Sequence, residues 1–154
     1  MIERIVVSGY RRFRTFDMTP RAGMNIVVGD NASGKSTLLE VITLALTGRL
    51  NGHWIGDELH PYLFNRHVVN EFFKEVRQKK KPAKPEILIE IYFTNNDNQL
   101  QHLRGKINSL KIDCPGLVLH IAPSPDFAPE FEEYLNDSSC PDILPTEFYS
   151  PEWR

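Results

Sequence analysis

The feature that most constrains this chain is a nine-residue stretch, Gly29-Asp30-Asn31-Ala32-Ser33-Gly34-Lys35-Ser36-Thr37. It matches G-x-x-x-x-G-K-[ST], the P-loop pattern that holds the phosphates of a nucleoside triphosphate. The pattern carries this meaning only where a strand leads into it and a helix follows it. Both flanks are indicated here, so the sequence predicts a phosphate-binding loop.

The flanking segments have the composition that this motif needs. Residues 24–28 (Met-Asn-Ile-Val-Val) are a short, mostly β-branched run, which is typical of a buried strand. From Lys35 to about Thr47 the chain is apolar nearly all round, as in a helix packed against a sheet. Gly48 is placed to end this helix in a left-handed conformation.

The residue types of the loop predict specific roles. Gly29 and Gly34 allow a tight turn in which successive backbone N–H groups point at phosphate oxygens, and the helix N-terminus adds partial positive charge. Lys35, the candidate catalytic residue, is expected at the β- and γ-phosphates, and Ser36 is expected to ligate Mg²⁺. The predicted cofactor-binding set in the loop is Asn31, Ala32, Ser33, Gly34, Lys35, Ser36 and Thr37.

Size and charge limit the class of protein. The chain has 154 residues, 41% of them hydrophobic, so we expect one globular domain spanning residues 1–154. A formal charge of −2 gives no overall electrostatic footprint for nucleic acid. With no apolar run of 18 residues and no signal segment, we expect a cytoplasmic protein with no membrane partner. Cys114 and Cys140 are interpreted as reduced thiols.

An arginine-rich hairpin is predicted ahead of the P-loop. Residues 2–7 form an opening strand, and Tyr10, Phe13 and Phe16 then alternate with arginines. We expect an antiparallel strand pair at the edge of the nucleotide site, where Arg11 and Arg12 flank the nucleotide or contact phosphate. The alternative is that these arginines lie on a solvated face of the hairpin.

The remainder of the chain alternates between helical and extended patterns. A second helix is expected over residues 65–79, followed by a lysine-rich run that is interpreted as a solvated loop or, alternatively, a nucleic-acid patch. Further elements are expected at residues 86–94 (strand), 98–104 (short helix), 116–122 (strand), 127–136 (helix) and 145–154 (extended).

Two features of a complete P-loop ATPase are missing from the sequence. Such an enzyme needs an acidic residue at a strand end to complete the Mg²⁺ shell. The nearest candidate, Glu90, lies in the middle of a predicted strand, where we expect an outward-facing charge. No Leu-Ser-x-Gly signature occurs. Because these two features are missing, we interpret the chain as an incomplete ATPase domain.

A metal site built from histidines is not indicated either. His53, His60 and His67 recur every seven residues, which does not fit a zinc site on one helix.

The motifs resemble a known family. The stretch from Gly29 to Thr37 is similar to the G-x-N-x-S-G-K-[ST] loop of ABC-type ATPases of the SMC and RecF sort, and residues 9–16 resemble their N-terminal hairpin. Residues 46–52, 58–65 and 144–154 resemble the OLD (overcoming lysogenization defect) family. This resemblance implies an α/β P-loop NTPase fold with a mixed sheet, the N-terminal antiparallel hairpin and the P-loop helix packed on the sheet.

The resemblance also implies a function. OLD relatives are ATP-dependent DNA endonucleases that join an ATPase to a C-terminal TOPRIM nuclease and dimerise, often in defence against phage. The implied partners are ATP, a second copy or the rest of an ATPase–nuclease chain, and DNA. No nuclease residues occur here, so nuclease activity does not carry over to this chain. Because the acidic strand-end and signature motifs are also missing, we expect ATP binding with poor hydrolysis. The alternatives are a nucleotide-gated DNA- or partner-binding module without catalysis and, with less support, a P-loop kinase.

Overall fold

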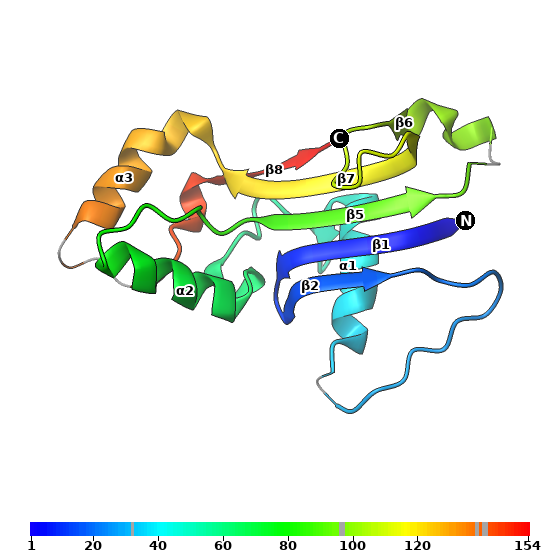
Figure 1. The fold of residues 1–154 in the computed structure, drawn as a ribbon, viewed down its shortest axis with the longest axis horizontal. Coiled ribbons are helices and arrows are strands. Elements are labelled where there is room, and N and C mark those ends of the chain that lie inside the picture. The colour runs from blue at the N-terminus through cyan, green and yellow to red at the C-terminus, as the bar shows by residue number, and fades with distance from the viewer. Residues whose placement is uncertain (32, 96–97, 138, 140–141) are drawn as a thin grey trace.

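The chain folds as a twisted antiparallel sheet with one helix on one face and two helices at one end (Figure 1). The computed structural model describes residues 1–31, 33–95, 98–137, 139 and 142–154. The P-loop helix, α1, lies behind the sheet in this view, and α2 and α3 lie side by side at the left. A long loop leaves the sheet after β2 and reaches the lower end of α1.

The six-stranded sheet has the order β2-β1-β5-β7-β6, and β8 also pairs with β7. Every pairing among its described strands is antiparallel, so the predicted mixed sheet is wrong, whereas the predicted N-terminal hairpin is confirmed. The strands are β1 (Ile2–Tyr10), β2 (Phe13–Met18), β5 (Ile87–Phe93), β6 (Arg104–Gly105), β7 (Cys114–Pro123) and β8 (Tyr149–Trp153).

The helix that follows the P-loop has the predicted bounds. α1 spans Lys35–Thr47 and buries Leu38, Val41, Leu44 and Ala45. It packs on the sheet face that carries Ile89 of β5, as predicted. Gly48 ends the helix at φ 69° and donates its N–H to the Leu44 carbonyl at 2.8 Å, so the predicted left-handed cap is confirmed. A short hairpin, β3 (Arg49–Leu50) and β4 (His53–Trp54), follows.

The other predicted helices are also present. α2 spans Arg66–Arg77 and is capped by Asn65, whose side chain accepts hydrogen bonds from the N–H groups of residues 67 and 68. α3 spans Ala128–Asn136 and buries Phe131 completely. Short 3-10 helices occur at η1 (Pro61–Leu63), η2 (Asn98–Leu103), η3 (Pro125–Phe127) and η4 (Thr146–Phe148). The predicted short helix after β5 is thus a 3-10 helix.

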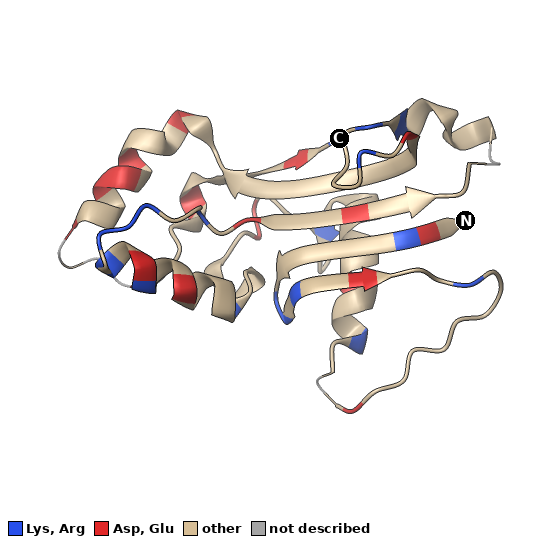
Figure 2. Ribbon diagram, viewed as in Figure 1, with Lys and Arg blue, Asp and Glu red and all other residues tan. Residues whose placement is uncertain are grey.

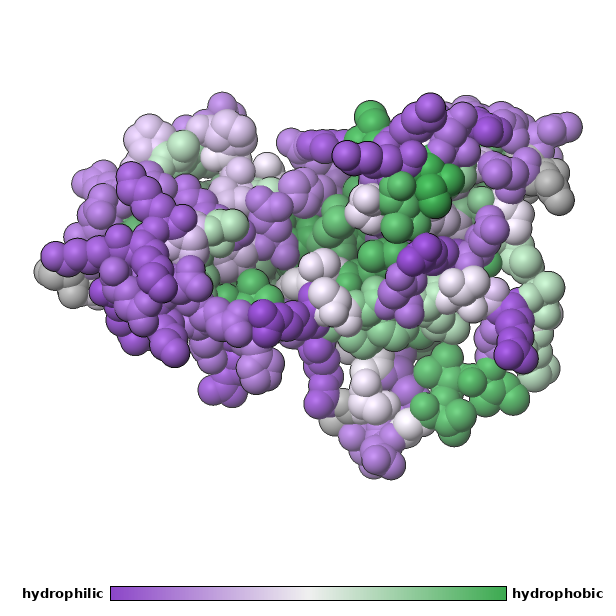
Figure 3. All heavy atoms as spheres, viewed as in Figure 1, coloured by the Kyte–Doolittle hydropathy of each residue, from purple (hydrophilic) through white to green (hydrophobic). Residues whose placement is uncertain are grey.

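The strand predicted before the P-loop is absent from the structure. Residues 24–28 form no ladder with any described strand, and Met24, Ile26 and Val28 are 88%, 77% and 88% exposed. In Figure 3 a hydrophobic cluster covers the loop between β2 and α1. A β-branched segment becomes a strand only where a neighbour accepts its backbone hydrogen bonds. No described strand lies in that position.

Candidate functional site

The candidate nucleotide site is the loop that leads into α1. The N–H of Ser33 donates to the Asp30 carbonyl at 3.0 Å, which closes a tight turn, and the N–H of Leu38 reaches back to Gly34 at 2.9 Å. Gly34 has φ 107°, a conformation that other residues rarely adopt. No side chain among the described residues caps the first turn, so its N–H groups are available to an anion.

The charges around this loop favour an anionic ligand. The Lys35 ammonium donates to the carbonyl oxygens of Gly29 and Asp30, at 2.9 Å for Asp30, and so lies over the loop. The first turn of α1 contains no acidic residue that would repel phosphate. Ser36 is exposed and its hydroxyl has no hydrogen-bond partner in the described part of the chain, which fits the expected contact with Mg²⁺.

The other predicted loop residues that the structure describes lie around the same turn. Asn31 and Ser33 are exposed, Thr37 is half-buried, and Ala32 lies outside the described residues. Residues 29 and 33 approach each other closely in this turn. A methyl group added at Gly29 would lie only 2.5 Å from the Ser33 hydroxyl. The structure thus brings the described members of the predicted loop set together, while their contacts with a nucleotide stay a prediction.

The N-terminal hairpin supports the loop directly. Phe13 at the start of β2 packs against Gly34, where an added methyl group would lie 3.1 Å from the aromatic ring. Phe13 also stacks on Phe16, with ring centroids 4.5 Å apart. Any side chain at Gly34 would therefore compete with this ring for space. This contact accounts for the position of the hairpin beside the nucleotide site, as predicted.

Arg11 is held by a carboxylate of the P-loop helix. Its Nε atom donates to Glu40 Oε1 at 2.6 Å, and the Tyr10 hydroxyl donates to the same oxygen at 2.5 Å. Burial and the hydrogen bond to Glu40 raise the pKa of Tyr10, so its hydroxyl stays protonated. Burial opposes the charge of Arg11, but Tyr10 and Glu40 outweigh it and raise the pKa of Arg11. The direct phosphate contact predicted for Arg11 stays a prediction, and its guanidinium already has an acidic partner.

Figure 2 shows basic residues at the turn between β1 and β2, and the other two arginines of the hairpin differ from Arg11 in their partners. Arg14 forms a two-armed ion pair with Glu71 of α2, at 3.1 and 2.8 Å. Arg12 is exposed and has no ion-pair partner among residues that the structure describes. Of the two predicted arginine contacts, Arg12 is thus the one with a guanidinium free to meet a ligand.

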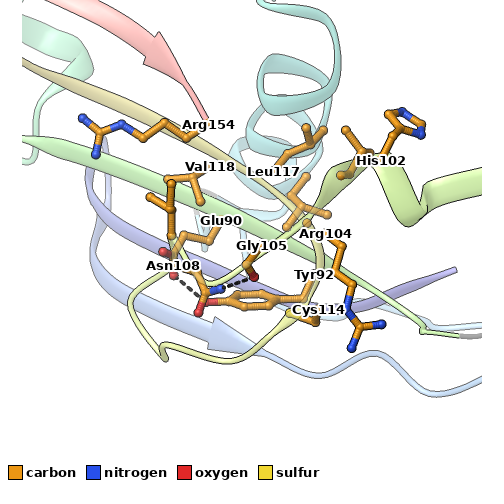
Figure 4. A pocket seen from close by; sticks show the side chains of 14 residues that line it. Glu90, Tyr92, His102, Arg104, Gly105, Asn108, Cys114, Leu117, Val118 and Arg154 are labelled. Carbon is orange, nitrogen blue, oxygen red and sulfur yellow. Dashed lines mark hydrogen bonds between the residues drawn. The ribbon is translucent and has the colours of Figure 1, made fainter.

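Glu90 does not face solvent, so that expectation is wrong. It is 1% exposed, and its carboxylate accepts hydrogen bonds from the Ser109 backbone at 2.7 Å and the Tyr92 hydroxyl at 2.9 Å. Burial, together with Glu90, raises the pKa of Tyr92 to about 12. Glu90 and Tyr92 border a cavity of about 210 Å³ between the sheet and the loop after β6 (Figure 4). Alternation along β5 puts Glu90 on the face opposite Ile89 and α1, away from the P-loop.

The lysine-rich run lies beside a groove between α2 and α3. Lys79, Lys80 and Lys81 are exposed, and the structure gives them no acidic partner in its described part. Lys84 differs, because it pairs with Glu132 at 2.9 Å and lies over the ring of Phe131. Cys114 is a buried free thiol, and Cys140 lies outside the described residues.

Two broader properties concern only the described residues. They contain no group of three histidine, cysteine or acidic side chains arranged to hold a metal ion. None of their helices combines the length and apolar character needed to cross a bilayer.

A glycine-rich turn that opens a sheet-packed helix, with a lysine folded over it, defines the class of P-loop nucleotide-binding proteins. A comparison with protein families agrees, because the family model described as "AAA domain" matches residues 4–133. The chain belongs to this AAA domain family of P-loop ATPases, and membership implies ATP binding.

Individual relatives match over shorter stretches. The chain is 45% identical over 49 residues to a DNA double-strand break repair Rad50 ATPase of Methanopyrus kandleri, covering 32% of this chain and 6% of that protein. It is 38% identical over 48 residues to a DNA replication and repair protein RecF of Stenotrophomonas maltophilia, covering 31% and 13%. The chain thus spans a small fraction of these relatives' length.

One solved structure is also similar. It comes from work on ATP-driven dimerization and DNA-stimulated activation of SMC ATPases, with a TM-score of 0.47 and 20% identity. The match covers 81% of this chain and 64% of that one. The resemblance to RecF-type ATPases read from the motifs is confirmed by the family and the relatives, whereas the narrower OLD resemblance stays a prediction.

Proposed function

We propose that this chain is the ATP·Mg²⁺-binding segment of an OLD-family ATPase that powers or regulates a DNA endonuclease located elsewhere in the full protein. The observation that carries the proposal is the geometry of the P-loop. Gly34 opens α1 in a left-handed conformation, and Lys35 lies over the carbonyls of residues 29 and 30. When a triphosphate binds, the Lys35 ammonium exchanges these carbonyls for phosphate oxygens.

Each group of the loop is assigned to a different part of the bound ATP·Mg²⁺. The N–H groups at the start of α1 hold the β-phosphate, Ser36 ligates Mg²⁺, and Thr37 lies on the α-phosphate side. Bound Mg²⁺ neutralises charge on the β- and γ-phosphates. Asn31 and Ser33 belong to the same turn, and the exposed Arg12 of the hairpin is the remaining proposed contact.

Hydrolysis needs acidic and signature motifs that this sequence lacks. The exposed apolar residues beside the P-loop sequence support the idea that another part of the ATPase packs here. Ile26 and Val28 are exposed, and Leu39 of α1 is itself 68% exposed. Such residues are ordinarily buried, and a strand-like apolar segment can pair with a strand of another chain or domain. We propose that the rest of the ATPase, in the same chain or in a dimer, covers these residues and supplies the missing acidic and signature motifs. DNA is the proposed final substrate of the assembly.

ATP titration of Ser36→Ala tests the metal role. We expect the unsubstituted chain to bind ATP more tightly with Mg²⁺ than with EDTA, and the variant to lose most of that difference, roughly tenfold in Kd. Binding in EDTA should stay similar, because the backbone N–H groups and Lys35 remain. Isothermal titration calorimetry measures both conditions, with Ser109→Ala, on the far sheet face, as the hydroxyl control.

The outcome that contradicts this assignment is equal Mg²⁺ dependence in the Ser36 variant and the unsubstituted chain. If the unsubstituted chain binds no ATP in either condition, the proposed function itself is wrong.

Replacing both Ile26 and Val28 with threonine tests whether these side chains are unpacked in this chain and contact another chain or domain. We expect the free energy of unfolding to change by no more than about 0.5 kcal/mol, because neither side chain is packed. Self-association at high concentration should fall, as followed by sedimentation velocity. Val7→Thr, at a position only 1% exposed, is the control and should cost about 1–3 kcal/mol. A loss in the double variant as large as in the control would show that residues 24–28 are packed in the fold.

A further inference from the structure

A carboxylate of the P-loop helix lies one turn from the residues expected to hold phosphate. Glu40 follows Thr37 by three positions and Ser36 by four, and it is the only acidic residue of α1. Residues at these spacings share one face of a helix, with Cβ atoms about 5–6 Å apart. An unpaired Glu40 would therefore repel a triphosphate held at the start of α1.

Arg11 neutralises this carboxylate from the hairpin. Its Nε and Nη2 atoms contact the two Glu40 oxygens at 2.6 and 3.3 Å, with both side chains about one-third exposed or less. Tyr10, which is completely buried, donates to the same carboxylate and limits its rotation. The ion pair is thus shielded from solvent more than an ordinary surface pair.

The turn that carries Arg11 is fixed by its surroundings. Arg11 has φ 45°, its N–H donates to the Leu63 carbonyl at 2.7 Å, and its carbonyl accepts from the Asn65 side chain at 2.8 Å. Asn65 is buried and also caps α2. The strained backbone is held by two elements distant in sequence, so the guanidinium is directed at Glu40 rather than left to sample the solvent.

We propose that Arg11 is a positioning residue for nucleotide binding that acts through Glu40. It neutralises and fixes a carboxylate that would otherwise disfavour the triphosphate at the P-loop. The inference rests on the proposed ATP binding, and it replaces direct phosphate contact by Arg11 with an indirect role. At separations below the Debye length of about 8–10 Å, a partly buried charge of this kind acts on a ligand with little screening.

A double-mutant cycle in ATP affinity tests the proposal. We expect Arg11→Met to weaken ATP binding about tenfold at low salt, because Glu40 is left unpaired. Glu40→Gln alone should change the Kd by less than about threefold, and the double variant Arg11→Met/Glu40→Gln should recover to within about threefold of the unsubstituted chain. Arg14→Met, which removes the exposed ion pair with Glu71, is the matched control and should bind normally.

The cycle separates an electrostatic role from a structural or a direct one. The double variant has lost the same ion pair as Arg11→Met. If Arg11 had a purely structural role, or contacted phosphate directly, the double variant would therefore bind ATP as weakly as Arg11→Met does. That result overturns the proposal. Unchanged affinity in Arg11→Met also overturns it. Thermal unfolding of each variant confirms that the compared chains are folded. Absence of ATP binding by the unsubstituted chain overturns the proposed function and this inference with it.

Discussion

Replacing Lys35 with alanine should remove measurable ATP binding, a loss of at least about 100-fold in affinity or roughly 2.7 kcal/mol. Lys35 opens α1, and its ammonium already lies over the phosphate-binding turn, where it contacts the carbonyls of Gly29 and Asp30. Charge-assisted hydrogen bonds to phosphate each contribute about 1.5–3 kcal/mol. Calorimetric titration with ATP and Mg²⁺ measures the change.

The Lys35 variant should keep its fold, because the lysine is partly exposed and its contacts stay within the loop. We expect the free energy of unfolding to change by less than about 1 kcal/mol. Lys80→Ala, which removes a lysine from the exposed run after α2, is the matched control and should bind ATP normally. An unchanged ATP affinity in the Lys35 variant would refute nucleotide binding at this loop.

Replacing Gly9 with alanine should lower the free energy of unfolding by about 3 kcal/mol or more. Gly9 has φ 73°, and an added methyl group would overlap the backbone carbonyl of Glu86 just before β5. A backbone atom cannot rotate away as a side chain can, so β1 and β5 would have to separate. Gly9 also accepts the N–H of Asn65 at 2.8 Å, so the start of α2 would shift as well. A loss of this size is a large fraction of the roughly 5–15 kcal/mol that holds a typical domain together.

Gly52 offers a matched control for backbone strain. It also has positive φ, 87°, but an added methyl group would meet nothing within 4 Å. Gly52→Ala should therefore cost only the strain of a left-handed residue, about 1–2 kcal/mol. Urea denaturation of both variants gives the comparison, and equal losses would show that the contact with Glu86 does not limit this position.

Predictions from sequence worked best where the determining interactions are local. The bounds of α1 are those predicted, since Gly34, the apolar run after Lys35 and Gly48 all lie within one short segment. The helix near residues 66–77 is confirmed for the same reason. Turn and cap residues act over three or four positions, so their effects can be read without knowing the fold.

Predictions failed where a distant segment decides the outcome. Residues 24–28 have strand composition but no described neighbour to pair with, so they stay exposed. Glu90 has the alternation of an outward-facing residue, yet the loop after β6 covers it and Ser109 donates to it. The strand directions, and with them the all-antiparallel sheet, also depend on pairings between segments far apart in the chain.

The sequence by itself determined that a phosphate-binding loop opens a buried helix, because the P-loop and its caps are local chemistry. Only the tertiary structure decided how that loop is supported. Arg11 and Glu40 are 29 residues apart, and Phe13 meets Gly34 only because the hairpin folds over the start of α1. Contacts of this kind depend on where the sheet places each element, and no local pattern encodes that placement.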